Sequence, residues 1–195
     1  MAAWKGAPRP RTSAVPLAGL ILAGGGSTRM GHDKALLALD GLTLLDRARA
    51  LLTEAGATRI LVAGRPDVEN GFADVTPGGG PARAARDALL ALADADCAVA
   101  LVVPVDMPLL TPEAFAPLIA AAAAGGAVYD GHPLPFCARL FAPTLDALEP
   151  NSLRDLLDGL GAVRLPPAGL DDSVFTNVNT PEDWRALVDR GPGSD

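Results

Sequence analysis

A glycine-rich segment near the start of the chain carries residue types that suit a polyphosphate. Residues 22–34 read LAGGGSTRMGHDK, and the segment begins in an apolar stretch. Glycine lets the main chain approach a ligand closely, and successive backbone N–H groups form a concave site for an anion. Arg29 and Lys34 add two positive charges. The segment therefore predicts a binding site for the phosphates of a nucleotide.

Two familiar phosphate loops do not fit this segment. Gly26 and Gly31 have the spacing of a Walker loop, but His32 and Asp33 follow where Lys and Ser or Thr belong. The dinucleotide fingerprint G-x-G-x-x-G fails as well, because Arg29 stands at the position of its third glycine. A Rossmann dehydrogenase is therefore disfavoured.

The order L-A-G-G-x-S-x-R-M-G-x-D-K resembles the signature loop of the nucleotidyltransferase superfamily, whose enzymes move a nucleoside monophosphate from a triphosphate to an acceptor. The double glycine after Leu-Ala most resembles the molybdenum cofactor guanylyltransferases. A glycine-rich turn with solvated charges is the structural alternative. The resemblance implies catalytic phosphate contacts from two cations and nucleotide contacts from the start of the loop: Arg29, Lys34, Leu22, Ala23, Gly24 and Gly25.

A carboxylate at the end of a second apolar stretch is the next chemical feature. Residues 101–108 read LVVPVDMP, so Asp106 follows a predicted strand. Mg²⁺ takes one or two carboxylates and completes its shell with phosphate oxygens and water. Asp106 is therefore a candidate metal ligand and catalytic residue, and the resemblance implies the same role. The pair Leu-Ala-Gly-Gly and Asp-Met-Pro favours guanine, because related cytidylyltransferases resemble Leu-Ala-Ala-Gly and Asp-Gln-Pro.

The segment 74–81, DVTPGGGP, resembles the part of the family that contacts the nucleotide. Gly80 and Pro81 would place bare backbone beside a flat ligand. Asp74 could accept hydrogen bonds from guanine N1 or N2, or from ribose. A surface loop with a solvated Asp74 is the alternative. After the second predicted strand, the family often carries Val-Asn-Ala-Asn-Arg, whereas residues 62–65 read VAGR, so that nucleotide contact is missing or replaced.

Residues 175–183, FTNVNTPED, resemble the closing Asn-x-Asn-Thr-Pro-Glu motif of the family. Thr180 is a suitable cap for the last helix. Asn177 and Asn179 are therefore candidates for phosphate, metal-shell or acceptor contacts. Two basic residues are further candidates for acceptor or phosphate contacts, with structural roles equally open: His132 and Arg154.

Alternating strand and helix patterns predict an α/β fold with a Rossmann-like, mostly parallel sheet covered by helices on both faces. The resemblance specifies the nucleotide-diphospho-sugar transferase type. The carboxyl ends of parallel strands share one edge, so residues 22–34 and Asp106 are expected to meet there. The predicted strands are 15–23, 58–63, 98–103, 127–129 and 136–140. The predicted helices are 42–55, 82–93, one from Thr111 through the alanine block to Gly125, 143–148, 152–157 and one starting within 179–183.

Length, composition and charge limit the class of protein and its cellular environment. The chain has 195 residues, of which 49% are hydrophobic, which suits one domain over residues 17–188 with a disordered extension (1–16) and a flexible tail (189–195). A net charge of −7 argues against a nucleic-acid surface. Two cysteines make no disulfide framework, so a reduced cytoplasmic setting is expected, with no zinc site and no membrane span.

The resulting hypothesis is transfer of GMP from GTP to the terminal phosphate of molybdopterin, with Mg²⁺ as cofactor and release of pyrophosphate. Molybdoenzymes or their chaperones would make transient contact with the product-bearing protein. Two alternatives stay open. A related transferase would use CTP or another phosphorylated acceptor, and a nucleotide-binding module would bind without turnover.

Overall fold

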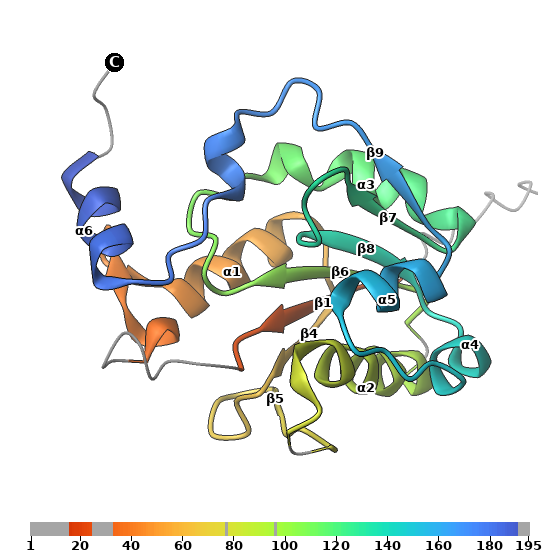
Figure 1. Cartoon of the computed structure of the whole chain (residues 1–195). Helices are drawn as coiled ribbons and strands as arrows, with labels where there is room; N and C mark the ends of the chain where they lie inside the picture. The colour runs from red at the N-terminus through yellow and green to blue at the C-terminus, as the bar shows by residue number, and fades with distance from the viewer. Residues whose placement is uncertain (1–15, 25–32, 77, 96, 191–195) are drawn as a thin grey trace, which may run out of the picture.

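The computed structural model describes residues 16–24, 33–76, 78–95 and 97–190 (Figure 1). A seven-stranded sheet runs through the middle of the molecule in the order β5-β4-β1-β6-β8-β7-β9. Neighbours β5, β4, β1 and β6 are parallel, as are β7 and β9, whereas β8 is antiparallel to both β6 and β7. The mostly parallel sheet is confirmed. Its strands are β1 (Leu17–Leu22), β4 (Arg59–Ala63), β5 (Gly71–Phe72), β6 (Val99–Pro104), β7 (Gly126–Tyr129), β8 (Phe136–Arg139) and β9 (Ala162–Leu165).

Helices cover both faces of this sheet (Figure 1). One face packs against α1 and α3, and the other against α2, α4 and α5. The α-helices are α1 (Leu44–Glu54), α2 (Gly80–Asp94), α3 (Ala116–Ala121), α4 (Ala142–Asp146), α5 (Leu153–Gly159) and α6 (Pro181–Arg190). Short 3₁₀ turns are η2 (Lys34–Leu36), η3 (Pro112–Ala114), η4 (Ala122–Ala124) and η5 (Asp172–Phe175).

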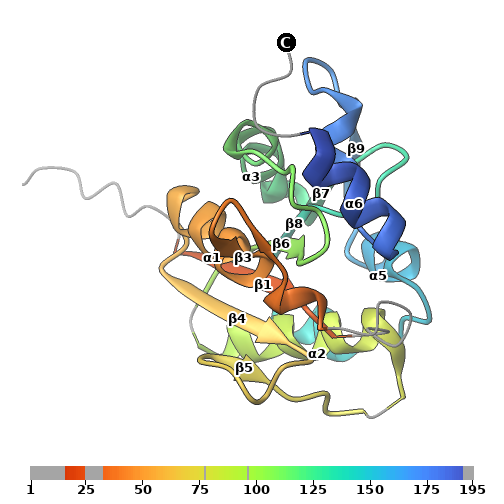
Figure 2. The ribbon, with the colours of Figure 1, turned by 90° about the vertical axis from the view of Figure 1, so that its left-hand side faces the viewer.

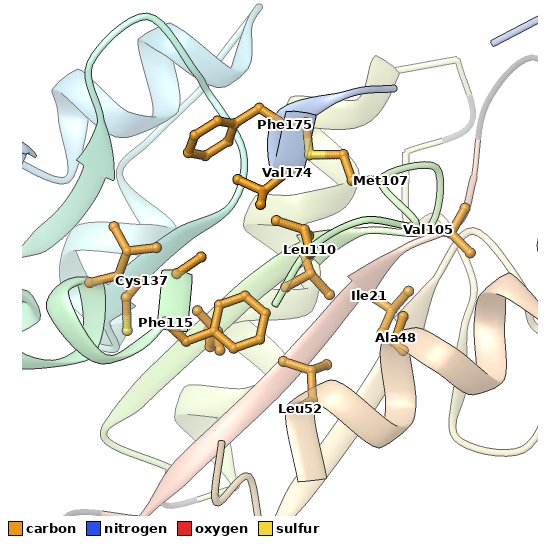
Figure 3. Packing of buried hydrophobic residues seen from close by; sticks show 14 of the residues in the cluster. Ile21, Ala48, Leu52, Val105, Met107, Leu110, Phe115, Cys137, Val174 and Phe175 are labelled. Carbon is orange, nitrogen blue, oxygen red and sulfur yellow. The ribbon is translucent and has the colours of Figure 1, made fainter. Parts of the chain in front are cut away.

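The apolar side chains of each strand divide between two cores, one on each face. On one face, Ile21 of β1 lies beside Ala48 and Leu52 of α1, as Figure 3 shows. On the opposite face, Leu20 of the same strand packs with Leu89 of α2. A central strand buried on both faces has no polar side to expose, which accounts for its unbroken apolar sequence.

The predicted helix 42–55 is wrong at its start. Leu42 and Thr43 form β3 (Leu42–Thr43), which pairs with β2 (Ala38–Leu39). The turn between them is Asp40-Gly41, where both residues have positive φ, a common hairpin signal. The helix then begins at Leu44, because the Thr43 hydroxyl accepts a hydrogen bond from Asp46 N at 3.0 Å.

The predicted continuous helix after Thr111 is also wrong. The chain forms η3, then α3, then η4, and the Thr111 side chain makes no capping hydrogen bond. Pro117 provides the reason, because proline has no N–H to donate and fits only the first turn of a helix. Three short elements replace one long helix. Strands β5 and β9 were not predicted at all.

Within the described residues, no helix is both long enough and apolar enough to cross a membrane. Cys97 and Cys137 are both buried and both free. Burial raises the pKa of the Cys137 thiol to about 12, so this side chain is an uncharged core residue.

Candidate functional site

Three chain segments meet at the carboxyl edge of β1 and β6. Lys34 opens η2, Asp106 follows β6, and Asn179 precedes α6. The Lys34 ammonium donates a hydrogen bond to Asn179 Oδ1 at 2.6 Å and lies 3.8 Å from Asp106 Oδ2. In both views, α6 lies beside the orange segment that contains η2 (Figure 1 and Figure 2). The fold therefore places a cation, a carboxylate and an amide from distant parts of the chain in one cluster.

The backbone around Asp106 fixes this cluster. Val105 and Met107 are buried on either side of it, and Figure 3 shows Met107 close to Val174 and Phe175. The Asp106 carbonyl accepts a hydrogen bond from Val178 N at 2.8 Å, which joins the two segments main chain to main chain. The carboxylate thus projects from an anchored strand end.

The start of α6 is capped by Thr180 and Asp183, and not by the side chain of Asn179. Thr180 Oγ1 accepts from Asp183 N at 3.1 Å, which confirms the predicted cap. Asp183 Oδ2 accepts in return from the backbone N–H groups of Asn179 and Thr180, at 2.9 and 2.8 Å. The Asn179 side chain is left available to Lys34. Asn177 is exposed two residues earlier.

The electrostatics of Asp106 follow from its partial burial. Its side chain is 24% exposed, and loss of solvent raises the pKa of the carboxyl. The nearby Lys34 ammonium opposes that rise in pKa by favouring the carboxylate. Among the residues that the structure describes, no group of three or more His, Cys, Asp or Glu side chains is arranged to hold a metal. A cation at Asp106 would therefore take most of its ligands from phosphate and water, a donor set that fits Mg²⁺.

A cavity of about 280 Å³ lies at the same carboxyl edge of the sheet, at the ends of β1 and β4. Four residues predicted to bind the nucleotide or to flank it line the cavity: Leu22, Gly24, Gly80 and Pro81. Asp74, also predicted, lines it as well and is exposed at its mouth. Ala23 follows Leu22 and donates its N–H to Ala63 O at 3.1 Å. Gly25 and Arg29 lie outside the described residues.

The cavity contains a residue that sequence reasoning missed. Gly64 has φ +80°, and a Cβ placed on it would come within 2.4 Å of Gly24 Cα. The two glycines therefore pack backbone against backbone where β1 and β4 end. The sequence signal was the glycine in VAGR, which departs from the family's Val-Asn-Ala-Asn-Arg, but only the fold shows what this glycine contacts.

A second, larger hollow of about 670 Å³ lies beyond Pro81, which lines both spaces. His132 and Arg154, predicted for the acceptor, both line it. The His132 ring stacks on Phe175 with centroids 4.0 Å apart and an interplanar angle of 16°. Phe175 belongs to η5, two residues before Asn177. Arg154 is exposed.

A mostly parallel sheet that gathers a glycine-walled cavity, a lysine and the Asp106 carboxylate at its carboxyl edge defines a nucleotide-handling α/β domain. Comparison with known proteins narrows this class. Residues 19–165 match the family described as the MobA-like NTP transferase domain. The chain therefore belongs to the MobA-like NTP transferase family and is a nucleotidyltransferase.

Individual relatives support the same assignment. The chain is 38% identical to the molybdenum cofactor guanylyltransferase of Xanthomonas euvesicatoria pv. vesicatoria, over 91% of this chain and 97% of that protein. It is 33% identical to the enzyme of that name from Rhodobacter capsulatus, over 89% of this chain and 96% of that enzyme. The crystal structure of molybdopterin-guanine dinucleotide biosynthesis protein A from Archaeoglobus fulgidus has the same fold, with a TM-score of 0.66 and 20% sequence identity. The match covers 89% of this chain and 100% of that protein.

Proposed function

We propose that this protein transfers GMP from GTP to the terminal phosphate of molybdopterin, forming the guanine dinucleotide of the molybdenum cofactor. The observation that carries the proposal is the cluster of Lys34, Asp106 and Asn179 at the same sheet edge as the glycine-walled cavity. Relatives that match nearly the whole chain are named for this activity. The catalytic unit is a single domain over residues 17–188.

The reaction needs no nucleophilic side chain. An oxygen of the acceptor phosphate attacks the α-phosphorus of GTP, a new P–O bond forms, and the bond to the bridging oxygen breaks with release of pyrophosphate. The attacking oxygen is already an anion at neutral pH, so no general base is required. Catalysis then depends on positioning and on neutralising charge along the line of displacement. Lys34 and Arg29 supply the positive charge.

Asp106 is the residue that would hold a divalent cation, for which we propose Mg²⁺. When bound, this ion would neutralise charge on the triphosphate. Lys34 stands 3.8 Å from the same carboxylate, so it favours the ionised form that a metal requires. Asn179 orients the Lys34 ammonium through their hydrogen bond, and Asn177 would face the phosphate or acceptor side.

We place the guanine in the 280 Å³ cavity. The main chain at Gly24, Gly64 and Gly80 forms walls without side chains, against which a flat base can lie. Asp74 at the mouth of the cavity is an acceptor for the guanine N1–H and N2–H groups, or for ribose. Cytosine has no donor equivalent to guanine N1–H, so Asp74 favours GTP over CTP. Leu22, Ala23 and Gly25 complete the nucleotide contacts.

We place the acceptor in the 670 Å³ hollow. Arg154 would pair with its phosphate, and His132 would contact its ring system. Pro81 borders both spaces, which puts the two substrates side by side. The proposed setting is the cytoplasm, with transient contact to molybdoenzymes or their chaperones, and with neither nucleic acid nor membrane as partner.

One experiment tests this function directly. Purified protein is incubated with molybdopterin, Mg²⁺ and either GTP or CTP, and the nucleotide product is identified by mass spectrometry. We expect the guanine dinucleotide and pyrophosphate, with little product from CTP. A preference for CTP would assign the protein to the cytidylyl branch. Nucleotide binding without pyrophosphate release would indicate a module without turnover.

A further inference from the structure

The position that follows Gly64 carries an arginine engaged by two carboxylates. Arg65 lies two residues after the end of β4, with its side chain only 13% exposed. Its Nε and Nη2 atoms donate to the two oxygens of Asp67, at 2.9 and 2.8 Å. Its Nη1 lies 2.8 Å from Asp33 Oδ2. The guanidinium therefore bridges its own loop and the end of the glycine-rich segment.

Asp33 connects this arginine to the catalytic cluster. One carboxylate oxygen, Oδ1, accepts a hydrogen bond from Ala35 N at 3.0 Å and so caps the 3₁₀ turn that begins at Lys34. The other oxygen faces Arg65. Both oxygens of Asp33 are thus engaged, and together they hold the turn from which the Lys34 side chain projects. The contacts continue from Lys34 to Asn179 and Asp106.

Charge also explains why an acidic residue is tolerated beside a polyphosphate site. An unpaired Asp33 would repel the phosphates, whereas the Arg65 guanidinium neutralises it. The bidentate pair with Asp67 holds the guanidinium in place for that task. Arg65 is consequently turned to carboxylates of the protein and acts on the ligand only through the turn at Asp33.

We propose that Arg65 is a positioning residue for GMP transfer, holding Asp33 so that the turn presents Lys34 to the phosphates. This inference rests on the proposed function, whose catalytic lysine it explains. We call the contacts of Arg65 with Asp33 and Asp67 the Arg65 clamp. Because this clamp acts on the phosphate site, its effect is expected with any ligand that carries a polyphosphate, whatever the base or the acceptor.

The test is a double-mutant cycle with Arg65→Met, Asp33→Asn and the double variant. Asparagine keeps the capping oxygen and removes only the charge. Each single variant is expected to lower kcat/KM for GTP about 10- to 100-fold, the range for residues that orient a group in contact with ligand. The double variant should be no worse than the more impaired single variant, because both substitutions break the same connection. Multiplied losses would overturn the proposal.

Two further variants sharpen the result. Arg65→Lys keeps the charge but cannot form the fork to Asp67 while reaching Asp33, so it should restore only part of the loss. Arg185→Met is the matched control, because it breaks an arginine–carboxylate pair of 2.7 Å on the exposed side of α6. Its kinetic constants should equal those of the wild type. A lowered Tm in Arg65→Met with unchanged kcat/KM would assign Arg65 a structural role only and overturn the proposal.

Affinity for inorganic tripolyphosphate with Mg²⁺, measured by calorimetry, separates this inference from the proposed function. The same cycle of variants should reduce that affinity in the same non-additive pattern. Tripolyphosphate binding without GMP transfer by the wild type would overturn the proposed function and leave the role of Arg65 supported by the cycle. Wild-type-like tripolyphosphate affinity in Arg65→Met would overturn the inference alone.

Discussion

The proposed nucleotide side and the proposed acceptor side of the site differ in how firmly their side chains are held. On the proposed nucleotide side, the Lys34 ammonium contacts both Asp106 and Asn179. A cavity of about 280 Å³ lies at the same edge of the sheet, at the ends of β1 and β4. On the acceptor side, the hollow of about 670 Å³ is lined by exposed Arg154 and by His132, which a ring stack holds.

This difference separates two tasks of one reaction. Groups that must meet a transition state gain from being fixed in advance, because no reorganisation is needed at the moment of reaction. A large acceptor that enters and leaves needs room, and contacts with it form on binding. We therefore expect substitutions on the nucleotide side to lower kcat and those on the acceptor side to raise the acceptor KM.

The largest effect is expected from Asp106→Asn. This change keeps the shape and the backbone bond to Val178 while removing the charge that would hold the cation. Turnover should fall by about 100-fold or more, as for other lost transition-state contacts. Mg²⁺-dependent pyrophosphate release measures it, and Asp146→Asn on α4 serves as a surface control. Near wild-type turnover with an unchanged Tm would show that the nucleotide side does not depend on the Asp106 charge.

Lys34→Ala is expected to lower turnover by a similar factor.

Gly64→Ala tests whether the nucleotide side depends on close backbone packing. The new methyl group would lie 2.4 Å from Gly24 Cα at φ +80°, so the two strand ends must separate. Stability should fall by about 1–3 kcal/mol from backbone strain alone, and more from the collision. GTP affinity should fall with it, as measured by calorimetry.

A matched control isolates the collision at Gly64. Gly169 has a similar φ of +83° with open space around it, so Gly169→Ala introduces the strain without the clash. This variant should lose some stability and keep its GTP affinity. Equal GTP affinities in the two variants would argue that Gly64 matters only for its φ.

Arg154→Met tests the acceptor side. Loss of one charge-assisted hydrogen bond costs about 1.5–3 kcal/mol, so the KM for molybdopterin should rise about 10-fold or more. The KM for GTP should stay unchanged. Arg139→Met, on β8 with its guanidinium near Ala123 O, is the control and should alter neither constant. An equal rise in the KM values for molybdopterin and GTP would show that Arg154 does not distinguish the acceptor side from the nucleotide side.

The smallest effect concerns the pH dependence of stability at the Arg65 clamp. The hydrogen bond from Arg65 lowers the pKa of Asp67 from 3.8 to about 2 in the folded protein. The folded state therefore binds this proton less readily than the unfolded state, and the stabilisation present above pH 3.8 is lost as the pH falls toward 2. Asp67→Asn should flatten this part of the stability curve in urea unfolding. An unchanged slope would show that Asp67 does not hold Arg65 in solution.

The sequence predicted the parts of this molecule that local patterns encode. The apolar runs at β1, β4 and β6 predicted buried parallel strands, and the TPED sequence predicted the cap at Thr180. The loop pattern predicted the family. The roles of Lys34 and Asp106 remain predictions that the geometry supports.

What the sequence did not predict depends on contacts between distant positions. Lys34 and Asn179 are 145 positions apart, and no periodicity links them. The Gly64 contact with Gly24 and the bridge from Arg65 to Asp33 join the segments that follow β4 and β1, which only the folded sheet brings together. The broken helix and the hairpin turn do have local signals, Pro117 within the helical pattern and the pair Asp40-Gly41 between apolar residues.

The packing of Gly64 against Gly24 has a consequence for redesigning base preference. An engineer who wished to place an asparagine at position 64 would find no room, since the neighbouring main chain already fills the space. Altered selectivity would have to come from other residues that line the cavity, such as Asp74 and Ala84.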